Sequence, residues 1–182
     1  MPHDRRMLPP PAPKDSLRIY KLCVVCLGNI CRSPMAEALI RAELAAAGLT
    51  ERVQVESAGT GDWHIGEPMD RTARAELMRR GYDGSSHRAR QISAAWLDQF
   101  DLLIAMDHSN LRNLQRMAGG RTDIIHRIRL FRSFDPAAPE DAEVPDPYGG
   151  DPEEFARVFD IIQAAARGLV SALQEVLEPA SG

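Results

Sequence analysis

Apolar residues in this chain gather in four short blocks, separated by longer stretches in which they recur at helical spacing. The blocks lie at 17–26, 52–60, 100–106 and 123–131, and the first becomes continuously apolar toward its end, in "LCVVC". Continuous apolar runs of this length are typical of strands buried on both faces of a parallel sheet. We therefore predict four parallel strands.

Between these strands, apolar residues recur every three or four positions. This spacing predicts a helix that begins at Pro34 and ends before Gly48, and another near 108–118. A further helix is predicted over 70–80, where Gly81 closes it. Each predicted helix follows a predicted strand, which is the order of a fold with parallel strands and crossover helices.

The last helix has the clearest signals at its start. Asp151 is placed to cap it, Pro152 suits its first turn, and Glu154 adds an acidic residue there. Strands alternating with helices predict an α/β fold, a four-stranded parallel sheet with helices on both faces. One apolar stripe then marks the buried face of the last helix: Phe155, Val158, Phe159, Ile162, Ala166, Leu169, Leu173 and Val176.

Length and composition limit the class of protein. The 182 residues match one domain, which we place at 17–182, after a Pro-rich tail at 1–16 that we expect to be disordered. The net charge of −4, without any block of Lys or Arg, argues against a nucleic-acid partner. A membrane span needs about 20 consecutive apolar residues, and no run approaches that length. We expect a monomer or a weak homo-oligomer.

The cysteines indicate the compartment. Cys23, Cys26 and Cys31 lie within nine residues of one another, which is no disulfide framework of a secreted protein. The polar, Pro-rich start of the chain lacks the apolar core of a signal peptide. We expect a cytoplasmic protein, while export without a signal peptide stays open.

The segment "CLGNICRSP", residues 26–34, follows the first strand and precedes the first helix. Ligands of open parallel sheets bind beyond the carboxyl ends of the strands, and the unpaired N–H groups at a helix start attract anions. Gly28 and Asn29 tolerate the backbone angles that turn such N–H groups inward. Arg32 adds a planar fork for pairs of phosphate oxygens. We therefore predict a phosphate-binding loop between the first strand and the first helix.

Cys26 lies at the base of this predicted loop. A helix N-terminus and a nearby arginine stabilise the thiolate form of a cysteine, and a thiolate beneath a bound phosphate is a nucleophile aimed at phosphorus. Ser33 is placed to hydrogen-bond the sulfur. A cysteine and an arginine at this spacing alone form a weak motif, and a plain strand end with a helix cap is the alternative. The Gly, Asn, Ser and Pro in register around them favour the catalytic interpretation.

At this point the sequence resembles a known family. The segment "VCLGNICRSPMAEAL" is similar to the signature loop of the low-molecular-weight protein tyrosine phosphatases of bacterial type. Further segments match that family in the same order, and the resemblance spans about 17–178: "SAGTGDWHIGEPMD", "HRARQI", "FDLLIAMDHSNLRNL" and "VPDPYGGD".

The resemblance implies a mechanism. Cys26 would attack the phosphorus of a protein phosphotyrosine and form a phosphocysteine, while Arg32 would bind the phosphate oxygens. Asp146, in the family's Asp-Pro-Tyr loop, would protonate the leaving phenolate and later activate water; read alone, it is a turn-forming residue before proline. The family uses no metal and no cofactor, and its partner is a phosphotyrosine-containing protein.

The resemblance also implies supporting roles for other residues. Trp63 and Tyr148 would form the walls of an aromatic slot, although ordinary core packing is an alternative for Trp63. One departure is Gly149, where many family members carry a second tyrosine. Cys31 is either a partner that protects Cys26 from oxidation or a small packing residue. The family's loop-supporting residues match Asn29, Ser33, Ser57 and His87, and Leu27, Gly28, Ile30 and Cys31 complete the phosphate loop.

Four other classes of protein were weighed against this one. The relay of thioredoxin-coupled arsenate reductases needs further cysteines down the chain, and none follows Cys31. A dithiol redox pair at Cys23 and Cys26 would span about 10 Å along an extended strand, which is too far for a disulfide. A zinc site lacks a second ligand pair. A non-catalytic phosphotyrosine-binding module would be expected to lose its nucleophile or its acid, and both are present.

Overall fold

A computed structural model describes residues 8–177. Its centre is one sheet of four parallel strands in the order β2-β1-β3-β4. These strands are β1 (Tyr20–Cys26), β2 (Val53–Gly59), β3 (Leu102–Ala105) and β4 (Ile128–Leu130). The sheet confirms the predicted four-stranded parallel architecture.

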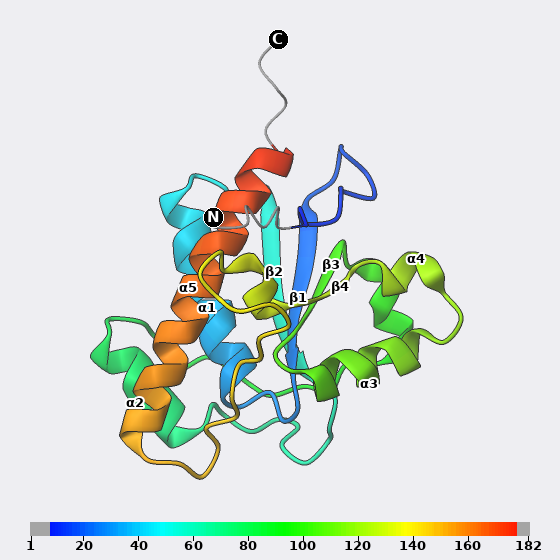
Figure 1. Cartoon of the computed structure of the whole chain (residues 1–182). Helices are drawn as coiled ribbons and strands as arrows, with labels where there is room; N and C mark the ends of the chain where they lie inside the picture. Colours follow the sequence, from blue (N-terminus) through cyan, green and yellow to red (C-terminus); the bar gives the residue numbers. More distant parts are fainter. Residues whose placement is uncertain (1–7, 178–182) are drawn as a thin grey trace.

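Helices cover both faces of this sheet (Figure 1). On one face lie α1 (Arg32–Ala46) and the long α5 (Pro152–Leu177), with α2 (Arg71–Arg79) packed against α5. The other face carries α3 (His108–Ala118) and the single-turn α4 (Thr122–Ile125).

Two 3-10 helices complete the fold: η1 (Ala94–Gln99) lies before β3, and η2 (Phe131–Phe134) follows β4. η2 packs against α5, and η1 contacts α3. Both are short connections that bring a buried apolar residue to the core, Leu97 in η1 and Phe131 in η2.

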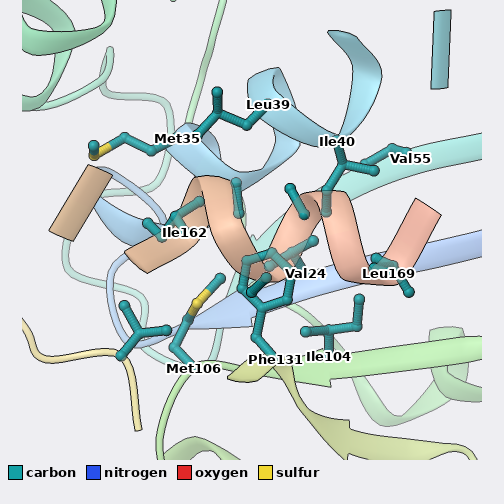
Figure 2. Packing of buried hydrophobic residues seen from close by; sticks show 14 of the residues in the cluster. Val24, Met35, Leu39, Ile40, Val55, Ile104, Met106, Phe131, Ile162 and Leu169 are labelled. Carbon is teal, nitrogen blue, oxygen red and sulfur yellow. The ribbon is translucent and has the colours of Figure 1, made fainter. Parts of the chain in front are cut away.

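The alternation of β1 divides the core into two layers. Leu22 and Val24 belong to the larger apolar cluster under α1 and α5, and Cys23 and Val25 belong to the smaller one under α3. Side chains of a strand point alternately to its two faces, so an unbroken apolar run is what a centrally placed strand needs. Figure 2 shows the larger cluster, in which Ile162 of α5 faces the side chains of the sheet and of α1.

The helix predictions agree closely with the structure. α1 begins two residues earlier than expected, at Arg32, and α3 spans the predicted 108–118. Asp151 caps α5 as predicted, because its Oδ1 accepts a hydrogen bond from the N–H of Glu154 at 3.0 Å. The apolar stripe of α5 is buried from Phe155 to Leu173.

The predicted strand at 123–131 is wrong over its first half. Residues 122–125 form α4, and only Ile128–Leu130 pairs as β4. β4 pairs through these three residues with Leu103–Ala105 of β3. The preceding helical turn also buries Ile124, against the smaller apolar cluster. Buried apolar residues therefore occur on both halves of the segment, which is why its pattern resembles one strand.

The predicted disordered tail lies partly outside the described residues, since it covers 1–16. Residues 8–16 contain no helix or strand, but they are hydrogen-bonded to the domain. The Pro11 carbonyl accepts from the hydroxyl of Tyr20 at 2.9 Å, and the N–H of Lys14 donates to Asp101 at 2.8 Å. Within the described part of the chain, no helix is long and apolar enough to cross a membrane.

Candidate active site

The predicted phosphate loop occupies residues 27–31, between the carboxyl end of β1 and the start of α1. Asn29 adopts the left-handed backbone conformation, with φ at 58°, which asparagine tolerates better than most residues. The loop packs on the end of β2, because a Cβ at Gly59 would lie 2.7 Å from the Leu27 carbonyl oxygen. Only glycine allows this close approach, and it holds the loop over the end of the sheet.

The sulfur of Cys26 receives two hydrogen-bond contacts at the base of the loop. Ser33 Oγ lies 3.0 Å from Cys26 Sγ, and the N–H of Asn29 donates to the same sulfur at 3.3 Å. Asn29 Nδ2 donates to Ser33 Oγ at 2.8 Å, so the single hydroxyl proton of Ser33 is free to point at the sulfur. The base of the loop therefore offers two hydrogen-bond donors to one sulfur.

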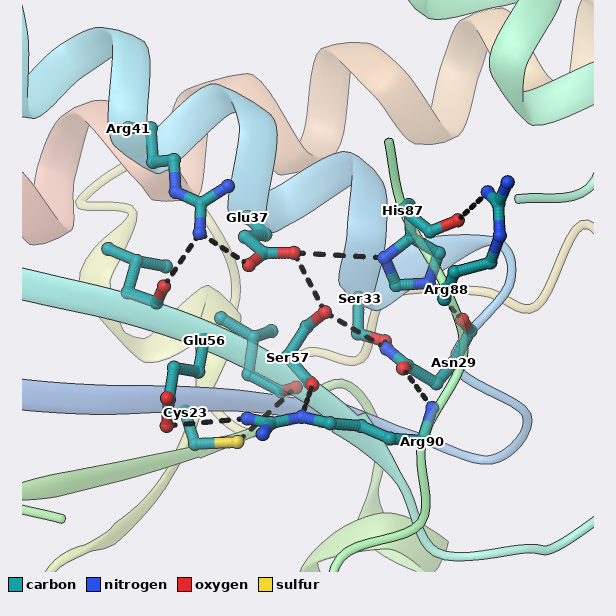
Figure 3. Close-up of polar contacts among 12 residues, drawn as sticks. Cys23, Asn29, Ser33, Glu37, Arg41, Glu56, Ser57, His87, Arg88 and Arg90 are labelled. Carbon is teal, nitrogen blue, oxygen red and sulfur yellow. Dashed lines mark hydrogen bonds and ion pairs between the residues drawn. The ribbon is translucent and has the colours of Figure 1, made fainter. Parts of the chain in front are cut away.

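A polar network behind the loop fixes Asn29 (Figure 3). Its Oδ1 accepts from the N–H of Arg90 at 3.0 Å, and its Nδ2 donates to Ser57 Oγ at 3.0 Å. His87 Nε2 donates to the carbonyl of Asn29 at 2.6 Å. The structure therefore brings together the loop-supporting residues that the family resemblance predicts.

Two members of this network were not predicted from the sequence. Glu37 Oε2 accepts from Ser57 Oγ at 2.9 Å and lies 3.9 Å from His87 Nδ1. Arg90 spans from Asn29 to Glu56 of β2, with which it forms an ion pair at 3.3 Å. Glu37 lies one helical turn after Ser33 on the same face of α1. This spacing is the only feature of the sequence that indicates a place for Glu37 near the loop.

Arg32 is almost fully buried, with 3% of its side chain exposed. Its Nη1 donates to Asp107 Oδ2 at 2.7 Å and to the carbonyl of Val144 at 2.9 Å, while Nη2 lies 3.7 Å from Asp146 Oδ2. Asp107 follows the carboxyl end of β3, the usual position of site residues in a parallel sheet. Sequence reasoning missed its role, although it directs the guanidinium.

A pocket of about 230 Å³ opens above the loop. Trp63 and Tyr148 form exposed parts of its wall, with 67% and 60% of their surfaces accessible. The Trp63 ring lies over Gly61, where a Cβ would come within 1.9 Å of it. The pocket is lined by Cys26, Leu27, Gly28, Ile30, Cys31, Arg32, Trp63, His64, Asp146 and Tyr148.

Asp146 and Tyr148 share one tight turn at the edge of the pocket. Asp146 Oδ1 accepts the N–H of Tyr148 at 3.1 Å, and Gly150 closes the turn by donating to Pro147 at 2.8 Å. Gly149 has φ at 80°, in the left-handed region that strains a side-chain-bearing residue. This conformation suits glycine at the position where many family members carry a second tyrosine.

The other two cysteines are buried and free, like Cys26. Burial raises the pKa of the Cys31 thiol well above its ordinary value, and the charges of Asp70 and Cys26 raise it further. Burial also raises the pKa of Cys23, which faces the opposite layer of the core. Within residues 8–177, no group of three or more His, Cys, Asp or Glu side chains is arranged to hold a metal ion.

The fold and this pocket together define a site for a phosphate ester. A loop before a helix N-terminus is suited to an anion, the first turn of α1 contains no acidic residue to oppose it, and a cysteine sulfur lies beneath. A guanidinium and a carboxylate flank that sulfur in the same pocket.

Comparison with known proteins supports this assignment. Residues 21–178 match the family model described as low molecular weight phosphotyrosine protein phosphatase. A low molecular weight protein-tyrosine-phosphatase of Streptomyces coelicolor is 46% identical over 160 residues, which cover 87% of this chain and 96% of that protein. The low molecular weight protein-tyrosine phosphatase A of Mycobacterium tuberculosis is 43% identical over 146 residues, covering 80% and 86%.

Solved structures show the same architecture. A protein tyrosine phosphatase of Entamoeba histolytica superposes with a TM-score of 0.80 at 36% identity, covering 86% of this chain and 97% of its own. The chain belongs to the low-molecular-weight phosphotyrosine protein phosphatase family, and its activity is that of a phosphoric monoester hydrolase.

Proposed function

We propose that this protein hydrolyses phosphotyrosine in proteins through a phosphocysteine formed on Cys26. The observation that carries the proposal is one pocket in which Cys26, Arg32 and Asp146 meet. A nucleophile, a phosphate-binding cation and a proton donor are what this reaction requires.

In the first step, the phosphate group binds to the N–H groups of the loop and to the guanidinium of Arg32. The Cys26 thiolate attacks phosphorus, and the bond from phosphorus to the phenolic oxygen breaks. Asp146 donates its proton to that oxygen, so tyrosine leaves as the neutral phenol. The hydrogen bond of Arg32 to Asp107 keeps the planar fork directed at the loop.

In the second step, the Asp146 carboxylate takes a proton from a water molecule, which attacks the phosphorus of phosphocysteine. The bond from phosphorus to sulfur breaks, inorganic phosphate is released, and the sulfur returns to the thiolate. The Ser33 hydroxyl stabilises the departing sulfur, since its proton is directed at Cys26. Asp146 has then regained the proton that it gave to tyrosine.

The shape of the pocket favours aryl phosphates. Cys26 lies at the base with 3% of its surface exposed, while Trp63 and Tyr148 stand at the rim. A tyrosine ring carries its phosphate far enough from the peptide backbone to reach the sulfur, and it gains contact with aromatic walls. A serine phosphate has no ring to contact these aromatic walls, so we expect it to be a poorer substrate.

The setting that we propose for this reaction is the cytoplasm, with phosphotyrosine-containing proteins as partners and a monomeric or weakly associated enzyme. Three free cysteines support a reducing compartment.

Kinetics of variants test the reaction, measured in the presence of a metal chelator. Cys26→Ser is expected to be inactive. Cys23→Ala should retain turnover, because the Cys23 side chain lies on the opposite face of β1. Asp146→Asn should lower kcat/KM for a phosphotyrosine peptide by about 10²–10⁴-fold, the usual contribution of a general acid. For 2,4-dinitrophenyl phosphate, whose phenolate leaves without a proton, the loss should be much smaller. A fully active Cys26→Ser enzyme would contradict the proposal.

A further inference from the structure

His64 lies in the wall of the pocket but takes no part in the two reaction steps. Its side chain is 26% exposed and lines the pocket together with Cys26 and Asp146. It belongs to the segment 60–67, which leads from the end of β2 toward α2. This segment brings His64 close to two other loops of the pocket.

A hydrogen bond to Glu67 fixes the imidazole of His64. A carboxylate only accepts hydrogen bonds, so Nδ1 donates its proton to Glu67 Oε2, at 2.7 Å. The backbone around it is pinned as well: the N–H of Glu67 donates to the His64 carbonyl at 2.8 Å. Ala89 bonds to both Gly66 and Glu67, each at 2.8 Å. The ring is therefore held by a segment that is itself anchored.

The same ring touches two loops of the site. A Cβ at Gly28 would lie 3.0 Å from His64 Cδ2, so the ring rests against the backbone of the phosphate loop. The ring centre also lies 6.1 Å from that of Tyr148, at an angle of 54°, which is a favourable tilted contact between rings. His64 thus connects the phosphate loop with the turn that carries the acid.

The acid itself has few other supports. The side chain of Asp146 is 47% exposed, and its ion pair with Arg32 is long, at 3.7 Å. Among residues 8–177, its carboxylate also accepts the hydrogen bond from the N–H of Tyr148 at 3.1 Å. The backbone of the turn that contains Tyr148 therefore helps to place the carboxyl group of Asp146 relative to Cys26.

We propose that the His64–Glu67 pair is a positioning element, which holds Tyr148 and through it aims Asp146 at the leaving oxygen of the substrate. The inference rests on the proposed function, because it assigns to Asp146 the role of proton donor. It assigns to His64 no contact with the reacting atoms. Loss of the pair should therefore slow substrates whose leaving group needs a proton from Asp146. It should have little effect on substrates whose leaving group needs none.

The proposal is tested by kcat/KM on two substrates, because this constant reports the steps up to phosphocysteine formation. His64→Ala should lower kcat/KM for a phosphotyrosine peptide by about tenfold, since misplacing a catalytic group has effects of this order. The loss on 2,4-dinitrophenyl phosphate should stay below about twofold, because its phenolate needs no acid. His126→Ala, at the exposed histidine that ends α4, is the control and should change neither value.

A double variant distinguishes positioning from other roles. In the Asp146→Asn background, His64→Ala should cause no further loss, since no acid is left to aim. His64→Asn keeps a donor toward Glu67 but lacks the ring, and should show the same selective loss if His64→Ala does not fold. Equal losses on both substrates, losses that multiply in the double variant, or no loss at all would overturn the inference. An active Cys26→Ser enzyme would instead overturn the proposed function, so the two failures are distinguishable.

Discussion

At the scale of single residues, two neighbouring cysteines have different surroundings. Both are buried, but Cys26 receives hydrogen bonds at its sulfur, whereas burial and nearby charges raise the pKa of the Cys31 thiol. Because we propose Cys26 as the nucleophile, we expect a peroxide to react first at its sulfur and to give a sulfenic acid. Cys31 remains a thiol, the form that condenses with a sulfenic acid to a disulfide and releases water.

We predict that Cys31 makes this oxidation reversible. After peroxide treatment, a thiol reductant should restore most of the activity of the native protein and much less of that of Cys31→Ser, because only the native protein forms the Cys26–Cys31 disulfide. Mass spectrometry of the oxidised protein should find that linkage. Equal recovery of both proteins without any linkage would leave Cys31 as a packing residue.

Much of the site could be predicted from sequence because its residues lie in one continuous loop. Cys26, Asn29, Arg32 and Ser33 follow one another within eight residues, so the sequence already predicts that they lie in one loop. Asp107 and the Val144 carbonyl meet Arg32 only through the packing of distant segments. A backbone carbonyl leaves no mark in a sequence, and an aspartate after a strand has many roles.

At the scale of elements, α5 packs on η2 so closely that one position of the helix admits no side chain. A Cβ at Gly168 would lie 1.8 Å from the Phe134 carbonyl oxygen and 2.8 Å from its carbon. Glycine inside a helix is unfavourable by about 1 kcal/mol relative to alanine, so the packing offsets this cost. The close contact holds the segment after β4, which leads to the loop of Asp146.

We predict that Gly168→Ala lowers the free energy of unfolding by about 1–3 kcal/mol, the usual range for overpacking, despite the better helix propensity of alanine. Ser171→Ala, at an exposed position of the same helix, should leave stability unchanged or slightly raised. Urea denaturation measures both. A Gly168→Ala protein as stable as the native one would show that the contact with η2 yields easily.

The elements themselves differ in how well their sequence defines them. α5 has a cap at Asp151 and a sustained apolar stripe, and both act locally. The segment 123–131 has apolar residues on both halves, but only tertiary pairing decides which of them form a strand. Pairing with β3 begins only at Ile128, and no pattern within 123–131 contains that information.

At the scale of the whole molecule, the two ends of the sheet have different roles. The phosphate loop lies at the carboxyl ends of the strands, while the segment 8–16 lies at the opposite end (Figure 1). That segment adds hydrogen bonds from Arg127 to the Ala12 carbonyl and from Arg129 to the Pro9 carbonyl. It therefore stabilises the edge of the sheet at β4 without approaching the site.

We predict that removal of 1–16 costs stability but not catalysis. Compared with removal of 1–7 alone, it should lower the free energy of unfolding by about 1–3 kcal/mol, because several hydrogen bonds of 8–16 are lost. The value of kcat/KM for a phosphotyrosine peptide should stay within about twofold, because the site is built from residues after 20. A large loss of kcat/KM in the folded truncated protein would show that the two ends of the sheet are coupled.

The central claim is that phosphate passes through Cys26, and trapping the intermediate tests it most directly. In Asp146→Asn, 2,4-dinitrophenyl phosphate still phosphorylates the sulfur, while hydrolysis lacks its base, so the phosphoenzyme should accumulate. Acid quenching followed by peptide fragmentation in a mass spectrometer locates the phosphoryl group. We predict that it is found on Cys26 and is absent when Cys26→Ser is added. A phosphoryl group on another residue, or turnover of this substrate by Cys26→Ser without a phosphoenzyme, would contradict the account.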